Sequence, residues 1–237
     1  MRNAFHDELD HISEQLVEMT RVAGSAIARA TTALVDADLH MAEDVITGDR
    51  TLDLARETLD ELAIDVLARQ QPVATDLRVV VTALRMSADL ERMGDLARHV
   101  AKVARLRYPR SAVPPSMRSL VLEMGQVAER IVAKAGSVIA ARDVDLAISL
   151  EKDDDAMDEL HRRVFTALHN TKLPTESIVD LTLLGRYYER FADHAVSVAR
   201  RVVYLVTGEH HTEAIVDHDF SEDATAVVWV REAYRPQ

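Results

Sequence analysis

Eight acidic residues stand in four pairs along the chain, and the two acids of each pair are four positions apart. On an α-helix this spacing places both carboxylates on the same face. Carboxylates held close together repel one another, which favours protonation or the binding of a cation. Oxygen ligands without thiolates suit Mg²⁺, Ca²⁺, Mn²⁺ or iron. The pairs are Asp49 and Asp53, Glu91 and Asp95, Asp154 and Asp158, and Glu189 and Asp193.

Two of these pairs belong to a repeated sequence frame. The segment from Leu90 reads LERMGDLARHVAKVA, and the segment from Tyr188 reads YERFADHAVSVARRV. Both follow the pattern Glu-Arg-x-(Gly/Ala)-Asp-x-Ala-x-x-Val. A single acidic pair means little in a chain in which 29% of the residues are charged, but recurrence of the whole frame indicates an internal duplication.

The rest of the chain supplies the helices that must position these acids. Apolar residues recur every three or four positions, which predicts an all-α fold with helices over residues 3–36, 39–70 and 73–107. Pro72 ends the second helix because proline cannot donate the helical hydrogen bond. After the proline-rich stretch RYPRSAVPP the pattern restarts as three more helices, with Pro174 before the last one and Gly208 at its end.

The chain is therefore expected to form two tandem, pseudo-repeated antiparallel three-helix bundles. The expected divisions are residues 1–107 for the first bundle, 108–115 for a proline-rich linker, 116–208 for the second bundle and 209–237 for an acidic tail. The helical periodicity fails in this tail, and no function is assigned to it.

The acids of the first unit are arranged symmetrically about Pro72, and those of the second unit about the midpoint of residues 173 and 174, beside Pro174. In an antiparallel hairpin, the four carboxylates of each unit then stand at one height, about 27–30 Å from the turn at 1.5 Å per residue. They are expected outside the bundle core, on a face that two helices share. Gly48 is expected in the apolar seam beside them, between Val45 and Leu52. This arrangement predicts one metal cluster in each unit.

Composition excludes several other functions. The absence of cysteine removes disulfides, thiolate metal sites and cysteine nucleophiles, and it fits a reducing cytoplasm. The net charge of -12 argues against non-specific binding to nucleic acid or to an anionic membrane surface. No apolar run approaches the roughly 18 residues of a spanning helix, and the charged N-terminal sequence does not suit a signal peptide. A soluble intracellular protein without membrane insertion is expected.

Three stretches carry a resemblance to a known family: QQPVATDLR from Gln70, DLERMGDLARHVAKVA from Asp89 and RYYERFADHAVSVARRV from Arg186. Over residues 1 to about 208 the chain resembles the PhoU family of phosphate-signalling regulators, in its actinobacterial form (PhoU/PhoY type). The resemblance implies Glu/Asp-x-x-x-Asp motifs that hold multinuclear iron or zinc clusters, and the eight acids named above occupy those positions.

The same resemblance implies a cytoplasmic, often dimeric protein that is not an enzyme. It implies a negative regulator that represses the phosphate-starvation response. Such a protein couples the Pst phosphate ABC transporter to a two-component sensor histidine kinase.

Two alternatives remain beside this interpretation. In a purely structural helical adaptor, the acids would be solvated and offset by neighbours such as Arg50, Arg92 and Arg190. A ferritin-like di-iron enzyme would need two Glu-x-x-His motifs, and only Glu8–His11 fits. No Walker loop, nucleophile elbow or His-Glu-x-x-His motif is present. His99 and His194 adjoin the acid motifs and are expected as partly exposed surface residues rather than ligands.

Overall fold

The computed structural model describes residues 2–209, which form helices and contain no strand. The all-α prediction is confirmed, and the predicted acidic tail lies outside the described residues apart from Glu209. Within the same range, no helix combines the length and the apolar character needed to cross a bilayer. The elements are α1 (Arg2–Asp36), α2 (Leu39–Gly48), α3 (Arg50–Gln70), α4 (Ala74–Arg107), a 3₁₀ turn η1 (Pro115–Met117), α5 (Arg118–Ala141), α6 (Val144–Asn170) and α7 (Thr175–Thr207).

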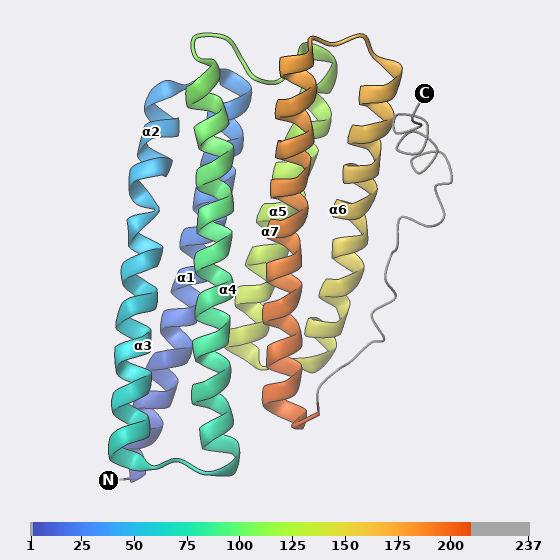
Figure 1. Ribbon diagram of the computed structural model, residues 1–237. Helices are drawn as coiled ribbons and strands as arrows, with labels where there is room; N and C mark the ends of the chain where they lie inside the picture. The colour runs from blue at the N-terminus through green and yellow to red at the C-terminus, as the bar shows by residue number, and fades with distance from the viewer. Residues whose placement is uncertain (1, 210–237) are drawn as a thin grey trace, which may run out of the picture.

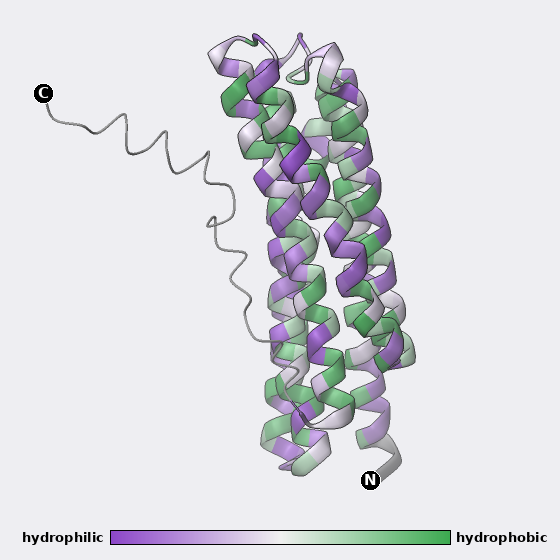
Figure 2. Ribbon diagram, turned by 90° about the vertical axis from the view of Figure 1, so that its right-hand side faces the viewer, coloured by the Kyte–Doolittle hydropathy of each residue, from purple (hydrophilic) through white to green (hydrophobic). Residues whose placement is uncertain are grey.

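Each half of the chain forms a three-helix bundle, as the duplicated pattern predicts. In the first unit, α1 and α4 pack on each other, and the consecutive helices α2 and α3 lie along both. In the second unit, α5, α6 and α7 all pack on one another. The α3–α4 turn and the α6–α7 turn lie at opposite ends of the molecule (Figure 1). The helices that face the viewer in Figure 2 carry both hydrophilic and hydrophobic stretches, as expected of amphipathic helices.

The two units also pack along each other, through α1 on α5 and α4 on α7. Glycines of α5 let it approach α1 closely. A Cβ atom on Gly125 would lie 2.5 Å from Cγ2 of Thr31, and one on Gly136 would lie 2.5 Å from Oγ1 of Thr20. The hydroxyls of Thr31 and the fully buried Tyr188 are hydrogen-bonded at 2.7 Å. The apolar core consequently runs from one unit into the other.

Ion pairs hold α4 on α7 across the same boundary. Nδ1 of His194 and Nε of Arg201 lie 3.1 and 2.8 Å from the two carboxylate oxygens of Asp89. At the C-terminal end of α4, Nε and Nη2 of Arg107 donate to the buried Asp180 of α7 at 2.6 and 3.0 Å. These contacts fix the relative height of the two units.

One predicted helix differs from the structure. The helix expected over residues 39–70 is interrupted at Asp49, where α2 ends and α3 begins. The amide of Leu52 donates to the carbonyl of Asp49 at 3.0 Å, so the chain tightens locally by one residue. Gly48, a weak helix former, immediately precedes the break.

The break corrects the expected seam. Gly48 is exposed, whereas Asp49 is only 7% exposed and takes the buried position between Val45 and Leu52. Between Val45 and Leu52, the helical spacing allows either Gly48 or Asp49 to occupy the buried position. Gly48 is expected there because it carries no charge, but the structure buries Asp49. The prediction that all eight acids lie outside the core is therefore wrong for Asp49.

Candidate metal centres

The four acids of the first unit come together between α3 and α4. Burial raises the pKa of Asp49, the nearby Arg98 lowers it, and the charges of Asp53, Asp95 and Glu91 raise it further. Carboxylates influence one another in this way only at short range. The grouping predicted from the symmetry about Pro72 is thus present.

Arginines neutralise much of this first cluster. Glu91 and Asp95 have side chains that are each only 16% exposed, so they are not freely solvated surface acids. Their partners lie on the same two helices. The ion pairs are Arg98 with Asp49 and with Asp95, Arg56 with Glu91, and Arg92 with Asp95. An ion-pair network of this kind lets the carboxylates remain charged without a metal.

The acids of the second unit also meet, between α6 and α7. Burial raises the pKa of Asp154 to about 7, with further upward contributions from Asp158, Asp193 and Glu189. Burial likewise raises the pKa of Glu189 to about 7, although the neighbouring Arg186 opposes the shift. At neutral pH each of these carboxyl groups is about half protonated, and a bound cation would favour the charged form of both.

The two clusters differ in their positive partners. Within the described residues, Arg186 is the one basic side chain in ion-pair contact with an acid of the second cluster, and it contacts Glu189. In the internal repeat, the position of Arg56 is taken by His161, and that of Arg98 by the buried Val196. The second cluster therefore keeps more uncompensated negative charge than the first.

The second cluster also contains buried polar atoms without partners. Oε2 of Glu189 and Nε2 of His161 are buried and have no hydrogen bond. Uncompensated carboxylates and unpartnered donor atoms together fit a cation such as iron, zinc, manganese, magnesium or calcium. Among residues 2–209, no three acidic or histidine side chains already converge as a coordination shell. Binding would therefore require the side chains of the cluster to rotate toward the ion.

The histidines next to the acid motifs have other surroundings. The ring of His99 lies 5.3 Å from the ring of Tyr187, and burial lowers its pKa. His194 is engaged with Asp89 at the boundary between the units, with a side chain that is 19% exposed. Sequence reasoning missed His161, which comparison with Arg56 in the other repeat would have revealed.

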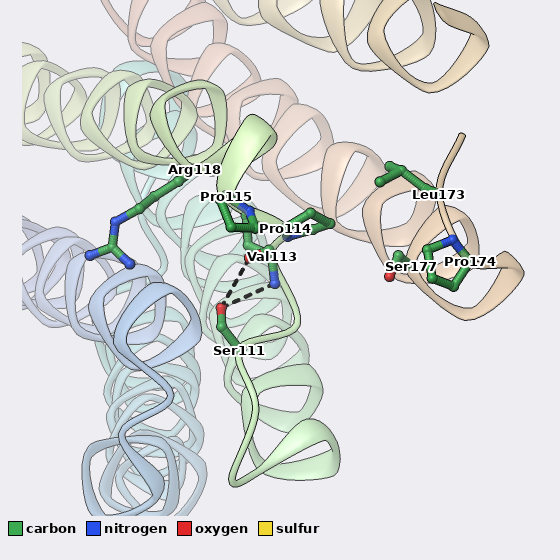
Figure 3. A pocket seen from close by; sticks show the side chains of 8 residues that line it. All are labelled: Ser111, Val113, Pro114, Pro115, Arg118, Leu173, Pro174 and Ser177. Carbon is green, nitrogen blue, oxygen red and sulfur yellow. Dashed lines mark hydrogen bonds between the residues drawn. The ribbon is translucent and has the colours of Figure 1, made fainter. Parts of the chain in front are cut away.

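A surface hollow of about 460 Å³ lies far from both clusters, at the α6–α7 turn (Figure 3). Pro114 and Pro115 line one side, and Leu173 and Pro174 line the other. Arg118 is directed away from them, because its guanidinium donates to the carbonyl of Val35 and to Asp36. The hollow contains no acidic side chain and is not a metal site.

Comparison with known proteins is consistent across sequence and structure. A family model described as the PhoU domain matches residues 16–104 and 121–202. The chain is 47% identical over 210 residues to "Phosphate-specific transport system accessory protein PhoU homolog 2" of Mycobacterium tuberculosis, covering 88% of this chain and 99% of that protein. It is 41% identical to homolog 1 of the same species, covering 90% of this chain and 97% of that protein.

The crystal structure of PhoU from Pseudomonas aeruginosa superposes with a TM-score of 0.78 at 30% identity, over 86% of this chain and all of that one (100%). The curated relatives are named as accessory proteins rather than enzymes, and this chain is likewise not an enzyme. The duplicated bundles, the repeated acid frame and these matches lead to one conclusion: the chain belongs to the PhoU family.

Proposed function

We propose that this protein is a metal-binding adaptor that negatively regulates phosphate uptake and the phosphate-starvation response. The names of its relatives support the transport role, since they describe accessory proteins of a phosphate-specific transport system. The observation that carries the metal-binding role is the meeting of four carboxylates in the second unit, where burial and the neighbouring acids raise the pKa of Asp154 and Glu189 to about 7.

The proposed ligands are the acids of the two clusters, and the ion would supply the positive charge that the second cluster lacks. The chain's own contribution is to bring four acids together in each unit, on α6 and α7 in the second unit and on α3, α4 and the α2–α3 junction at Asp49 in the first. A cation shared between them would tie α3 to α4 or α6 to α7. The acids are Asp49, Asp53, Glu91 and Asp95 in the first unit, and Asp154, Asp158, Glu189 and Asp193 in the second.

The proposed partners are a Pst-type phosphate transporter and a sensor histidine kinase, in the cytoplasm, with the protein acting as a homodimer. An adaptor needs surface that other proteins can cover. Large apolar side chains are exposed near the helix turns, among them Val73 and Leu77 beside the first turn and Val179 and Leu183 beside the second. Apolar groups of this kind favour protein contacts over contact with water.

A purely structural adaptor remains the second candidate, and the first cluster favours it. There, Arg56, Arg92 and Arg98 already pair with the acids, which makes a cation unnecessary for charge balance. The metal content of protein purified without added metal separates the two candidates. Bound metal supports the first candidate, and metal-free protein with full regulatory activity supports the second.

The regulatory role is tested by deletion in a strain that carries no second copy. Loss of the protein is expected to derepress phosphate uptake and a starvation-gene reporter in high phosphate. Complementation with the parent chain should restore repression. Unchanged reporter expression in the deletion strain would contradict the proposal.

A further inference from the structure

His161 marks the chemical difference between the two clusters. It lies on α6, three residues after Asp158, so both side chains project from neighbouring positions on one helix face. Its ring lies against α7 at Gly185, where a Cβ atom would be 3.0 Å from Cδ2 and 3.5 Å from Nε2 of the imidazole. A methyl group at Gly185 would crowd the ring, and the corresponding residue of the first unit is Ser87.

The His161 ring also lies close to an aromatic ring of its own helix. The centroids of the His161 and Phe165 rings lie 5.0 Å apart at an interplanar angle of 49°. Phe165 is one turn further along α6 and is 48% exposed, so it lies toward solvent. The imidazole thus has both Phe165 and the α7 backbone at Gly185 as close neighbours.

Helix geometry directs His161 and Glu189 toward each other. Side chains lean toward the N-terminus of their own helix. Because α6 and α7 are antiparallel, His161 leans toward the level of Asp158, while Glu189 leans back toward the level of Gly185. Nε2 of His161 and Oε2 of Glu189 are both buried, and neither has a hydrogen-bond partner. The charge of Asp158 acts on both residues, so all three belong to one cluster. Arg186 also acts on both, and it pairs with Oε1 of Glu189, which leaves Oε2 for a cation.

We propose that His161 is a nitrogen ligand of the cation held by the second cluster, beside Asp158 and Glu189. The inference rests on the proposed metal-binding function. It makes the second centre a mixed nitrogen and oxygen site, whereas the first offers oxygen alone and has Arg56 at the equivalent position. Imidazole suits zinc and iron, while carboxylate-only sites suit magnesium, calcium and manganese. The second centre should therefore prefer zinc or iron over magnesium more strongly than the first centre does.

The test uses the full-length chain, stripped of metal and titrated with Zn²⁺ and separately with Mg²⁺. His161→Gln removes a direct ligand, so it is expected to weaken Zn²⁺ binding by at least about 10–100-fold, the loss typical of removing an outer-shell partner of a metal ligand, and to leave Mg²⁺ binding unchanged. His169→Gln is the matched control, since His169 is an exposed histidine on the same helix. It should leave both affinities unchanged.

X-ray absorption of the Zn²⁺-loaded parent gives a readout that does not depend on the stability of a variant. Imidazole scattering should be present in the parent and in His169→Gln, and should fall in His161→Gln. If the parent binds Zn²⁺ through oxygen alone, or if His161→Gln binds as the parent does, the role of His161 is wrong and metal binding stands. If the parent binds no metal, the proposed function itself fails.

Discussion

Two acids of the second cluster, Asp154 and Glu189, sit where their charged forms are disfavoured. Their pKa values of about 7 arise first from burial and then from neighbouring carboxylates. A surface acid would titrate near its ordinary value and would have little effect on stability at neutral pH. In the folded chain, the charged forms of these two carboxyl groups are therefore unfavourable, and binding of a proton or a cation lowers their free energy.

These raised pKa values predict a pH dependence for the metal-free chain. The folded state holds protons on Asp154 and Glu189 up to about pH 7, whereas the ordinary pKa values of these side chains are 3.8 and 4.5. Between these limits the folded state binds more protons, so the contribution of these groups to stability falls as the pH rises. The thermal unfolding temperature, measured in chelator from pH 5 to 8, should fall more steeply for the parent than for Asp154→Asn.

The quantity that tests this prediction is the difference in pH dependence between the parent and Asp154→Asn. The lowered pKa values of His99 and His161 act in the opposite direction over part of this range, and they are common to both chains. If the unfolding temperatures of the parent and of Asp154→Asn change equally with pH, the pKa of Asp154 is not raised in the folded chain.

At the scale of the elements, periodicity and proline positions predicted most of what positions the acids. Pro72 and Pro174 set two hairpins, and symmetry about each proline correctly brought four acids together. The burial of Asp49 could not be predicted from its own helix, because it depends on contact with Gly94 of α4. The Asp49 carboxylate packs close to this glycine, where an added Cβ atom would lie 3.2 Å from Oδ1. The close packing of the two units could not be predicted either, since each amphipathic helix pattern specifies a buried face without naming the helix that covers it.

The α1–α5 contact predicts a glycine-specific effect on stability. Gly125→Ala places a methyl group 2.5 Å from Cγ2 of Thr31, which must force a shift in a packed interface. Overpacking of this kind costs about 1–3 kcal/mol in the free energy of unfolding, measured by denaturant titration. Gly48→Ala is the control, because nothing lies within 4 Å of its added Cβ atom, and it should stabilise the chain by about 0.5–1 kcal/mol. Equal effects at both positions would contradict the tight α1–α5 packing.

For the molecule as a whole, the repeat has produced two units of similar shape and different charge. Arg56 and Arg98 neutralise the first cluster, and His161 and Val196 stand in their places in the second. The units are joined at α4 and α7 by Asp89 and its partners, and one of these partners, His194, immediately follows the cluster residue Asp193. On our proposal, the second cluster binds a cation more tightly than the first, because arginines already balance the charge of the first cluster.

The boundary between the units is tested by Asp89→Asn. His194 and Arg201 would lose a charged acceptor that is largely buried, with a side chain only 13% exposed. Loss of hydrogen bonds to a charged group predicts a destabilisation of about 1.5–3 kcal/mol. Asp44→Asn removes the exposed pair with Arg29 and should change stability by less than about 1 kcal/mol. If the two variants lose equal stability in denaturant titrations, the α4–α7 ion pairs do not hold the units together.

The central claim, that the acid clusters bind a cation and that the second binds it more tightly, is tested most directly by titrating the metal-free chain with Zn²⁺. Three proteins are compared: the parent, Asp49→Asn with Asp53→Asn, and Asp154→Asn with Asp158→Asn. The parent and the first-unit variant should both show the tight binding phase, and the second-unit variant should lose it. Absence of binding to the parent, or loss of the tight phase in the first-unit variant alone, would contradict the claim.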